Sequence, residues 1–389
     1  LRSASFPWAW SPTAINPAAT INKILFMIYN TFVIPYLHTN LIFLSYFCRK
    51  GKDFIMAEET FADLGRVEAI ARLYEGTPYK PFESSWFETS SKGFITSNSR
   101  TFIEGIDFDL TYFPLKHLGY KCVTAVTGEL YAEFSHPRVM DIRLGISSKL
   151  DFGHIKDIWE GIFTAAREHG YKKVSLDLLP SPNGLAISVS STGETSILMG
   201  KRRPAARSMD LICVSDNLGA AYMGFQILER ERRAFEKSGD AKAQPKLDDY
   251  KNLIGAYLKP QINPQIINQM EDAEIVPSFG YLVTRGLADS VKRLVRDSGF
   301  GAKIYVDKLP FAGKTFESGK ELNIDPISAA LNGGEDYRLL FTIPIGKHDK
   351  FRHDFQTFDI IGHLAKPEVG AVLVTPDGVE LPMKAQGWK

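Results

Sequence analysis

Cysteine is scarce in this sequence of 389 residues, and neither positive nor negative charge is in clear excess. The only cysteines are Cys48, Cys122 and Cys213, and none shows a C-x-x-C or Cys/His spacing. This pattern argues against a disulfide framework and against a zinc site. Because 46 Lys and Arg face 45 Asp and Glu without a long basic run, the basic surface of a general nucleic-acid binder is missing as well. We expect a cytoplasmic protein that binds no nucleic acid.

The common catalytic motifs are also missing. The chain has no G-x-G-x-x-G after a strand pattern, no G-x-S-x-G and no H-E-x-x-H. Residues 313–315, Gly-Lys-Thr, resemble the end of a phosphate-binding P-loop, but Lys308 stands where that loop needs glycine and Pro310 interrupts it. The eight histidines are scattered, which favours structural roles for them over a shared site.

Residues 1–55 differ in composition from the rest of the chain. They are rich in Phe, Ile, Leu, Tyr and Asn, and their stretch 24–47 is apolar but interrupted by Asn30 and Pro35. A membrane span is therefore not favoured, since it wants about 20 mostly apolar residues. From Met56 an acidic first turn leads into a helical apolar pattern. We interpret residues 1–55 as an extension outside the fold, either a start assigned too early or a weak hydrophobic segment.

Helix and strand patterns alternate from residue 56 onward. Asp151 is a predicted N-cap of a helix that Gly170 ends, and a second amphipathic helix is predicted over 287–298. Strand patterns occur at 172–179, 185–194, 210–215, 302–306, 337–344, 358–365 and 371–378. The class is α/β or α+β. A basic, proline-containing stretch at 200–209 predicts two domains, 56–198 and 199–389, each large enough for its own core.

Four longer blocks stand above this background. They are EGIDFDLTYFPLKHLGYK at 104–121, DLICVSDNLGAAYMG at 210–224, LNGGEDYRLLFTIP at 331–344, and IGHLAKPEVGAVLVTPDG at 361–378 followed by KAQGWK. Together, in this order, they resemble the thiamine-monophosphate kinases, members of the aminoimidazole ribonucleotide synthetase superfamily. The resemblance runs from about Met56 to Lys389. It implies a two-domain synthetase-like fold, a homodimer formed through the N-terminal domains, and ATP-dependent phosphorylation of thiamine monophosphate to the diphosphate with Mg²⁺.

The resemblance also implies acidic Mg²⁺-binding motifs, because phosphoryl transfer between two polyanions depends on charge neutralisation. Three of these positions still hold a carboxylate: Glu83 stands loosely for a Gly-Asp-Asp, Glu129 for the acid of a Ser-Asp, and Asp177 for that of a Gly-Gly-Asp. We consider these three as remnant metal ligands, with ordinary surface or capping roles as the alternative.

Other acids of the family are replaced. Arg100 stands where an Asp precedes E-G-x-x-F-D-L, and the motif Asp-x-Ser-Asp-Gly-Leu corresponds to LVTRGL, so that its acids become Leu282 and Arg285. A guanidinium at a Mg²⁺ position replaces attraction by repulsion worth on the order of 4 kcal/mol per unit charge pair. One hypothesis is that Arg100, Arg202 and Arg285 hold phosphate directly. The other is that the arginines are solvated or paired with acids such as Glu104 or Asp289.

Further candidates lie in the blocks themselves. Asp107, Asp109, Glu335 and Asp336 are substrate-side candidates, although the glycines of the GGEDY block favour a mostly structural role for that block. Asp216 replaces a family glycine and would place a negative charge beside any phosphate held there.

The sequence therefore predicts a divergent kinase homologue with impaired or absent catalysis, a pseudoenzyme that binds a nucleotide or a phosphorylated small molecule. One alternative is an active ATP- and Mg²⁺-dependent kinase with a reduced metal site. Another is a non-enzymatic dimer partner of an active homologue.

Overall fold

The computed structural model describes Glu68 and residues 85–88, 93–196, 199–200, 203–238 and 247–385. Contacts divide the chain into two units, Leu1–Glu59 and Thr60–Lys389, and the described residues belong to the second. The predictions for residues 1–55, for the helix after Met56, and for Glu83 and Arg202 lie outside the described residues. Within the described part, no helix is both long enough and apolar enough to cross a membrane.

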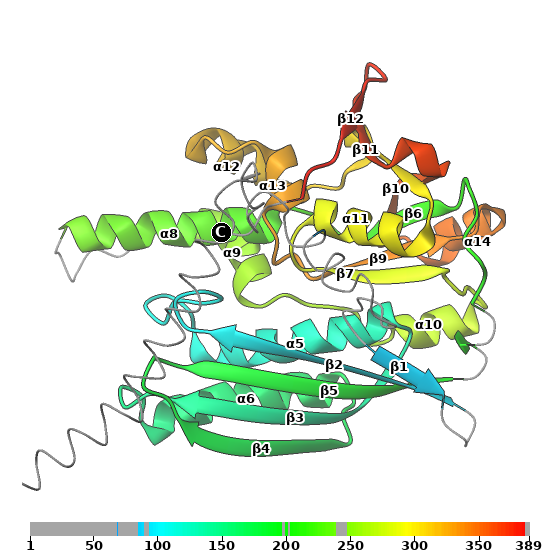
Figure 1. The fold of residues 1–389 in the computed structure, drawn as a ribbon. Coiled ribbons are helices and arrows are strands. Elements are labelled where there is room, and N and C mark those ends of the chain that lie inside the picture. Colours follow the sequence, from blue (N-terminus) through cyan, green and yellow to red (C-terminus); the bar gives the residue numbers. More distant parts are fainter. Residues whose placement is uncertain are drawn as a thin grey trace, which may run out of the picture. The chain divides into compact units, whose positions relative to one another are not determined.

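The first sheet has five strands in the order β1-β2-β5-β3-β4 (Figure 1). Its strands are β1 (Ser85–Glu88), β2 (Gly93–Ile103), β3 (His136–Ile146), β4 (Lys173–Pro180) and β5 (Ala186–Ser196). Only β3 and β4 run parallel; the other pairs are antiparallel. Helix α5 (Leu115–Ala132) packs on β2 and β5, and helix α6 (Phe152–Glu168) packs on α5.

Two glycines bring α5 and α6 into backbone contact. A Cβ atom on Gly161 would lie 1.9 Å from the carbonyl oxygen of Lys116, and one on Gly119 would lie 2.1 Å from that of Ile158. Only a residue without a side chain allows this approach. Helix α6 begins as predicted, because the carboxylate of Asp151 accepts a hydrogen bond from the backbone N–H of His154 at 3.0 Å.

The second sheet has seven strands in the order β12-β11-β8-β10-β6-β9-β7. Its strands are β6 (Leu211–Ser215), β7 (Phe279–Val283), β8 (Gly301–Tyr305), β9 (Arg338–Ile343), β10 (Phe358–Ala365), β11 (Ala371–Val374) and β12 (Glu380–Pro382). Its helices are α8 (Ala220–Ser238), α9 (Lys251–Leu258), α10 (Ile266–Asp272), α11 (Leu287–Ser298), α12 (Thr315–Leu322), α13 (Pro326–Asn332) and α14 (His348–Asp354). Short 3-10 turns are η2 (Asp248–Tyr250), η3 (Val306–Lys308), η4 (Ile345–Lys347) and η5 (Pro367–Val369).

Helix α5 lies between the two sheets (Figure 1). It contacts β2 and β5 on one side and β7 and β9 on the other. Fourteen of its residues are buried, and its side chains join a hydrophobic core that includes residues of both halves. The predicted boundary near residue 198 falls between the two sheets, but the division into two domains stays a prediction.

The strongly periodic elements are where the sequence places them. The helix predicted over 287–298 is α11, and Gly299 ends it with a left-handed φ of 71°. The predicted strands correspond to β4, β5, β6, β8, β9, β10 and β11. The fold class, a mixed helix and strand protein with an aminoimidazole ribonucleotide synthetase-like architecture, is confirmed by the structural neighbours reported below.

A buried histidine closes the contact between α5 and α6. His169 is 5% exposed, and its Nδ1 lies 3.0 Å from the hydroxyl oxygen of Tyr131. Burial lowers the pKa of His169 to about 4. The folded protein therefore keeps this imidazole neutral at pH values at which the unfolded chain binds a proton.

We expect the free energy of unfolding to fall between pH 6.5 and pH 4 because of His169. The unfolded chain gains a proton near pH 6.5 while the folded protein resists protonation until about pH 4, a difference worth up to about 3 kcal/mol. Urea unfolding across this range, for the protein and for His169→Gln, measures the effect. The variant should show a weaker decline with acidification; an identical decline in both would contradict the assignment to His169.

Candidate functional site

A cluster of charged side chains joins the two halves of the protein. The carboxylate of Glu335 lies 2.8 Å from Nζ of Lys121 on α5, and it accepts a hydrogen bond from Nη2 of Arg100 on β2 at 3.1 Å. It also accepts one from the hydroxyl of Tyr337 at 3.0 Å. Arg100 lies 3.7 Å from Asp107 as well. Both oxygens of Glu335 are therefore occupied by cationic or hydroxyl donors.

Lys121 is the most deeply buried charge of this cluster. Its side chain is 2% exposed, and its Nζ lies 3.8 Å from the ring centroid of Tyr257 and 5.2 Å from that of Phe113. Burial lowers the pKa of Lys121, and Glu335 opposes this effect. Burial alone would raise the pKa of Glu335, but Lys121 and Arg100 outweigh it and lower that pKa to about 2. Glu335 therefore stays ionised throughout the physiological range.

The GGEDY block forms the turn that presents Glu335. Gly334 and Glu335 both have left-handed φ values, 79° and 64°, and the N–H of Glu335 donates to the carbonyl of Thr284 at 2.8 Å. Asp336 is 3% exposed and accepts hydrogen bonds from the N–H groups of Gly219 and Ala221 at 2.9 and 3.3 Å. Asp336 thus caps the start of α8. These contacts support the mostly structural interpretation of the block.

The pKa of Asp336 is raised to about 7, chiefly by burial, although the N–H groups of Gly219 and Ala221 counteract this. Its role as a helix cap therefore weakens when it becomes protonated below neutral pH.

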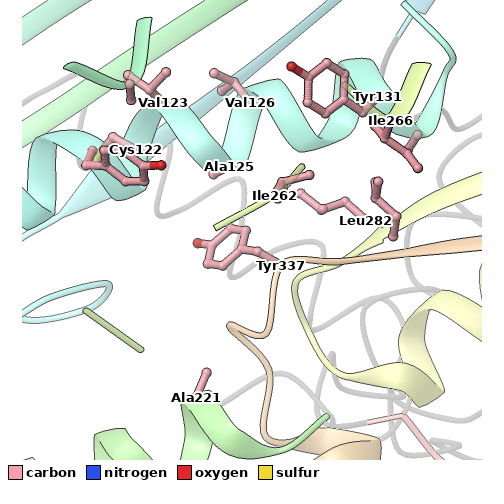
Figure 2. Close-up of a cluster of buried hydrophobic side chains, with 14 of the residues drawn as sticks. Cys122, Val123, Ala125, Val126, Tyr131, Ala221, Ile262, Ile266, Leu282 and Tyr337 are labelled. Carbon is pink, nitrogen blue, oxygen red and sulfur yellow. The ribbon is translucent and has the colours of Figure 1, made fainter. Parts of the chain in front are cut away.

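Gly128 and Leu282, which stand in two motifs that the resemblance assigns to the metal site, meet in an apolar contact. Ile262 and Leu282 lie side by side beneath α5 in Figure 2. A Cβ atom on Gly128, where the family has serine, would lie 2.5 Å from Cδ1 of Leu282 and 2.7 Å from Cδ1 of Ile262. Leu282, where the family has an acid, is fully buried. Packing has thus replaced polar groups at this point.

The two predicted arginines flank the same turn. Arg100 reaches Glu335 through its side chain, and Arg285 directly follows Thr284, whose carbonyl accepts from Glu335. The Arg285 side chain is exposed. Arg100 pairs with the acids Glu335 and Asp107, and not with Glu104. Glu104 instead accepts from the N–H of Leu185 at 2.7 Å, and Asp289 lies 3.1 Å from Arg293.

The two remnant acids that the structure describes, Glu129 and Asp177, do not converge within one chain. Glu129 lies half-buried on α5, whereas Asp177 is exposed on β4. Cross-strand neighbours in the first sheet share a face, so two adjacent rows define its two faces. One row is Arg100, Val189, Ile142 and Leu176, and the next is Thr101, Ser188, Arg143 and Asp177. Because α5 carries Lys121 toward Glu335 and Arg100, it covers the first face, and the sheet separates Glu129 from Asp177.

Asp107 and Asp109 build the loop between β2 and α5. Asp107 accepts from the N–H of Ile103 at 2.8 Å, and burial raises its pKa. Asp109 accepts from the N–H and the hydroxyl of Thr111 at 2.8 and 2.7 Å. Their hydrogen bonds are those of a structured turn, and a substrate-side role for them stays a prediction.

The described residues do not fit the Mg²⁺ that the resemblance implies. No group of three His, Cys, Asp or Glu side chains in the described part of the chain could hold a metal ion. Mg²⁺ is usually bound through carboxylates in octahedral geometry, yet here Glu335 is occupied by two cations and Leu282 is buried in the core. We therefore derive no catalytic step through the metal.

Sequence reasoning missed two central residues of this site, Lys121 and Tyr337. Lys121 and Tyr337 lie within the quoted blocks LGYK and GGEDY, but nothing in their spacing shows that α5 carries Lys121 to Glu335 over a sequence separation of more than two hundred residues. The signal that could have identified Lys121 is its place in a mostly apolar stretch of the helix 115–132, with no acid three or four residues away.

Curated sequence relatives and solved structures agree with the predicted family, although no family model matches the chain. Thiamine-monophosphate kinase of Pyrococcus horikoshii is 28% identical over 276 residues, which covers 70% of this chain and 78% of the relative. The enzyme of Aquifex aeolicus is 26% identical over 248 residues, covering 64% and 75%.

Solved structures show the same fold. The structure of AaThiL complexed with AMPPCP and TMP has a TM-score of 0.69 at 23% identity and covers 87% of this chain and 99% of its own. The Escherichia coli hydrogenase maturation protein HypE has a TM-score of 0.57 at 14% identity and covers 82% and 96%. The fold therefore defines the class as the two-sheet α/β proteins that include these two. Within this class, the curated sequence relatives are thiamine-monophosphate kinases at 26 and 28% identity, and the chain is a divergent homologue of them.

Proposed function

We propose that this chain is a thiamine-monophosphate kinase homologue that has lost magnesium-dependent phosphoryl transfer and still binds a nucleotide or a phosphorylated small molecule. The carrying observation is the cluster of Arg100, Lys121 and Glu335, which puts two cations around Glu335, with Arg100 at a position that the resemblance assigns to an acid. The packing of Leu282 against Ile262 and Gly128 supports the same conclusion. The relative solved with AMPPCP and TMP supports ATP and thiamine monophosphate as the ligands to test.

The physical reason is electrostatic. Transfer of a γ-phosphoryl group to another phosphate needs positive charge close to the negative charge of the phosphate oxygens. In such reactions Mg²⁺ supplies that charge. Losing one positioned charge of this kind costs about 10³-fold in rate. Arg100, Leu282 and Arg285 stand at three such positions, so little turnover should remain.

Two other functions remain as alternatives. An active kinase with fewer metal ions would use Glu129, Asp177 and Glu83. A non-enzymatic partner would pair with an active homologue through the first sheet, whose outward row of Thr101, Ser188, Arg143 and Asp177 is available for such contact. A homodimer through this half, and the cytoplasmic location, stay predictions.

We expect the purified full chain, given ATP, Mg²⁺ and thiamine monophosphate, to form thiamine diphosphate at least about 10³-fold more slowly than 1 s⁻¹, because several charge-neutralising positions are lost. Product is measured by chromatography. A rate of about 1 s⁻¹ or faster would contradict the proposal.

Asp177→Asn serves as a control in that assay. If slow turnover occurs and the variant abolishes it, the reduced-metal kinase is favoured; unchanged turnover assigns it to background. Thermal unfolding with ATP, in Mg²⁺ and in EDTA, separates loss of catalysis from loss of binding. The proposal requires stabilisation that does not depend on the metal.

A further inference from the structure

A large cavity lies in the second half of the protein and is not part of the charged cluster. It has a volume of about 720 Å³. We call it the amide pocket, because four side-chain amides line it together with an apolar floor. The amides are Asn217, Gln261, Asn263 and Gln356, and the floor is Ile262, Ile266, Pro310, Phe311, Leu339 and Phe358.

The walls of the amide pocket are held by hydrogen bonds between separate loops. The N–H of Asp216 donates to the carbonyl of Thr357 at 2.9 Å, and that of Leu218 donates to the carbonyl of Pro310 at 2.9 Å. Arg338 ties the loop after β6 to the loop before α10, since its Nε donates to the carbonyl of Asn217 at 3.1 Å and its Nη1 to that of Gln261 at 3.5 Å. A cavity fixed in this way is formed before any ligand arrives.

The charges of the amide pocket disfavour a bare phosphate. Asp216 and Arg338 form an ion pair at 3.0 Å, so that this arginine is already neutralised. Asp359 makes no hydrogen bond or ion pair with the described residues and adds a negative charge. Side-chain amides offer both donors and acceptors, and the Oδ1 of Asn217 is buried without a partner. The lining therefore suits a planar nitrogen heterocycle that carries its own donors and acceptors.

A second cavity adjoins the amide pocket. It has a volume of about 560 Å³ and shares Pro310 and Asp359 with the first. Its lining includes three basic side chains, Lys308, His348 and Arg352, and two acids, Asp307 and Asp359. We call it the basic pocket because the basic side chains outnumber the acids. Cationic side chains of this kind bind phosphate through charge-assisted hydrogen bonds.

We propose that the two pockets form one site for a phosphorylated nitrogen heterocycle, with the ring in the amide pocket and the phosphate in the basic pocket. This inference rests on the proposed function insofar as it locates the retained ligand. Nucleoside monophosphates and thiamine monophosphate both join such a ring to a phosphate, and the experiment distinguishes them. Asp359, at the junction, would accept hydrogen bonds from the ribose hydroxyls of a nucleoside monophosphate or lie beside the positively charged thiazolium ring of thiamine monophosphate.

Titration calorimetry of the full chain in EDTA tests the site. The probes are AMP and thiamine monophosphate, each with its unphosphorylated parent, adenosine or thiamine, and inorganic phosphate. We expect one phosphorylated compound to bind at least about tenfold more tightly than its parent. Arg352→Ala should remove that advantage and leave the parent unaffected, whereas Lys350→Ala, an exposed lysine on the same helix outside both pockets, should change neither. Gln261→Leu should weaken compound and parent alike, by about fivefold.

Several results would overturn the site. They are no binding of any compound at millimolar concentration, equal affinity of compounds and parents, and equal effects of Arg352→Ala and Lys350→Ala. Binding that only inorganic phosphate shows would also overturn it. Magnesium-dependent formation of thiamine diphosphate would overturn the proposed loss of catalysis but not this site, so that the two can fail separately.

Discussion

Replacement of Glu335 by alanine is expected to lower the free energy of unfolding by about 3 kcal/mol, because it leaves Lys121 charged and buried without its partner. The side chain of Lys121 is 2% exposed, so water does not replace the carboxylate. The rings of Tyr257 and Phe113, 3.8 and 5.2 Å from Nζ, remain to stabilise the ammonium group. Urea unfolding followed by circular dichroism measures the change.

A double variant separates the ion pair from the turn that holds it. Lys121→Met together with Glu335→Gln removes both charges at similar volume, and it should recover most of the loss. Glu321→Ala, an acid with an exposed side chain that pairs with Arg230, serves as the surface control and should cost no more than about 1 kcal/mol. Equal losses for Glu335→Ala and Glu321→Ala would show that the cluster contributes nothing beyond a surface pair.

Gly161→Ala is expected to destabilise the protein by about 3 kcal/mol. The added methyl group would meet the backbone of α5, at 1.9 Å from the carbonyl oxygen of Lys116, and a backbone cannot turn aside as a side chain does. Helices α5 and α6 must then move apart. Because α5 also carries Lys121, the displacement should weaken the charged cluster as well. Thermal and urea unfolding measure the loss.

Gly255→Ala provides the matched control. Gly255 also lies within a helix, α9, but a Cβ atom there would meet nothing within 4 Å. The same substitution should therefore be neutral or stabilise the protein by up to about 1 kcal/mol, through the higher helix propensity of alanine. Similar effects at the two glycines would contradict the close contact between α5 and α6.

Elements with a strong local pattern could be predicted from sequence. Asp151 is the N-cap of α6 and Gly299 is the C-cap of α11, and both residue types are typical of these positions. The apolar strands β6 and β9 lie inside the blocks that carry the family resemblance. The short helices α9, α10 and α14 could not be predicted in this way. Each has eight residues or fewer, which is too short for a periodic pattern, and packing determines them more than propensity does.

For the candidate site, too, local features could be predicted from sequence and contacts between distant segments could not. The sequence marks Arg100, Leu282 and Arg285 as departures from the family pattern, because single substitutions of acids by arginine or leucine are visible one residue at a time. It could not identify Lys121 as the partner of Glu335 or place Asp177 on the opposite face of the sheet from Arg100. Both depend on pairing between distant segments.

The sequence by itself determined the class of fold and the resemblance to thiamine-monophosphate kinases, and it predicted the loss of acids at the positions that this resemblance assigns to magnesium. Those properties are carried by residue identity and order. Only the tertiary structure decided what surrounds these positions, an ion-pair cluster between two sheets and an apolar contact of Gly128 with Leu282, and where the two adjoining cavities beside Arg338 lie. The reason is that charge pairing, burial and cavity shape arise between residues that lie far apart in the chain, and only the packing of α5 between the two sheets brings the charged cluster together.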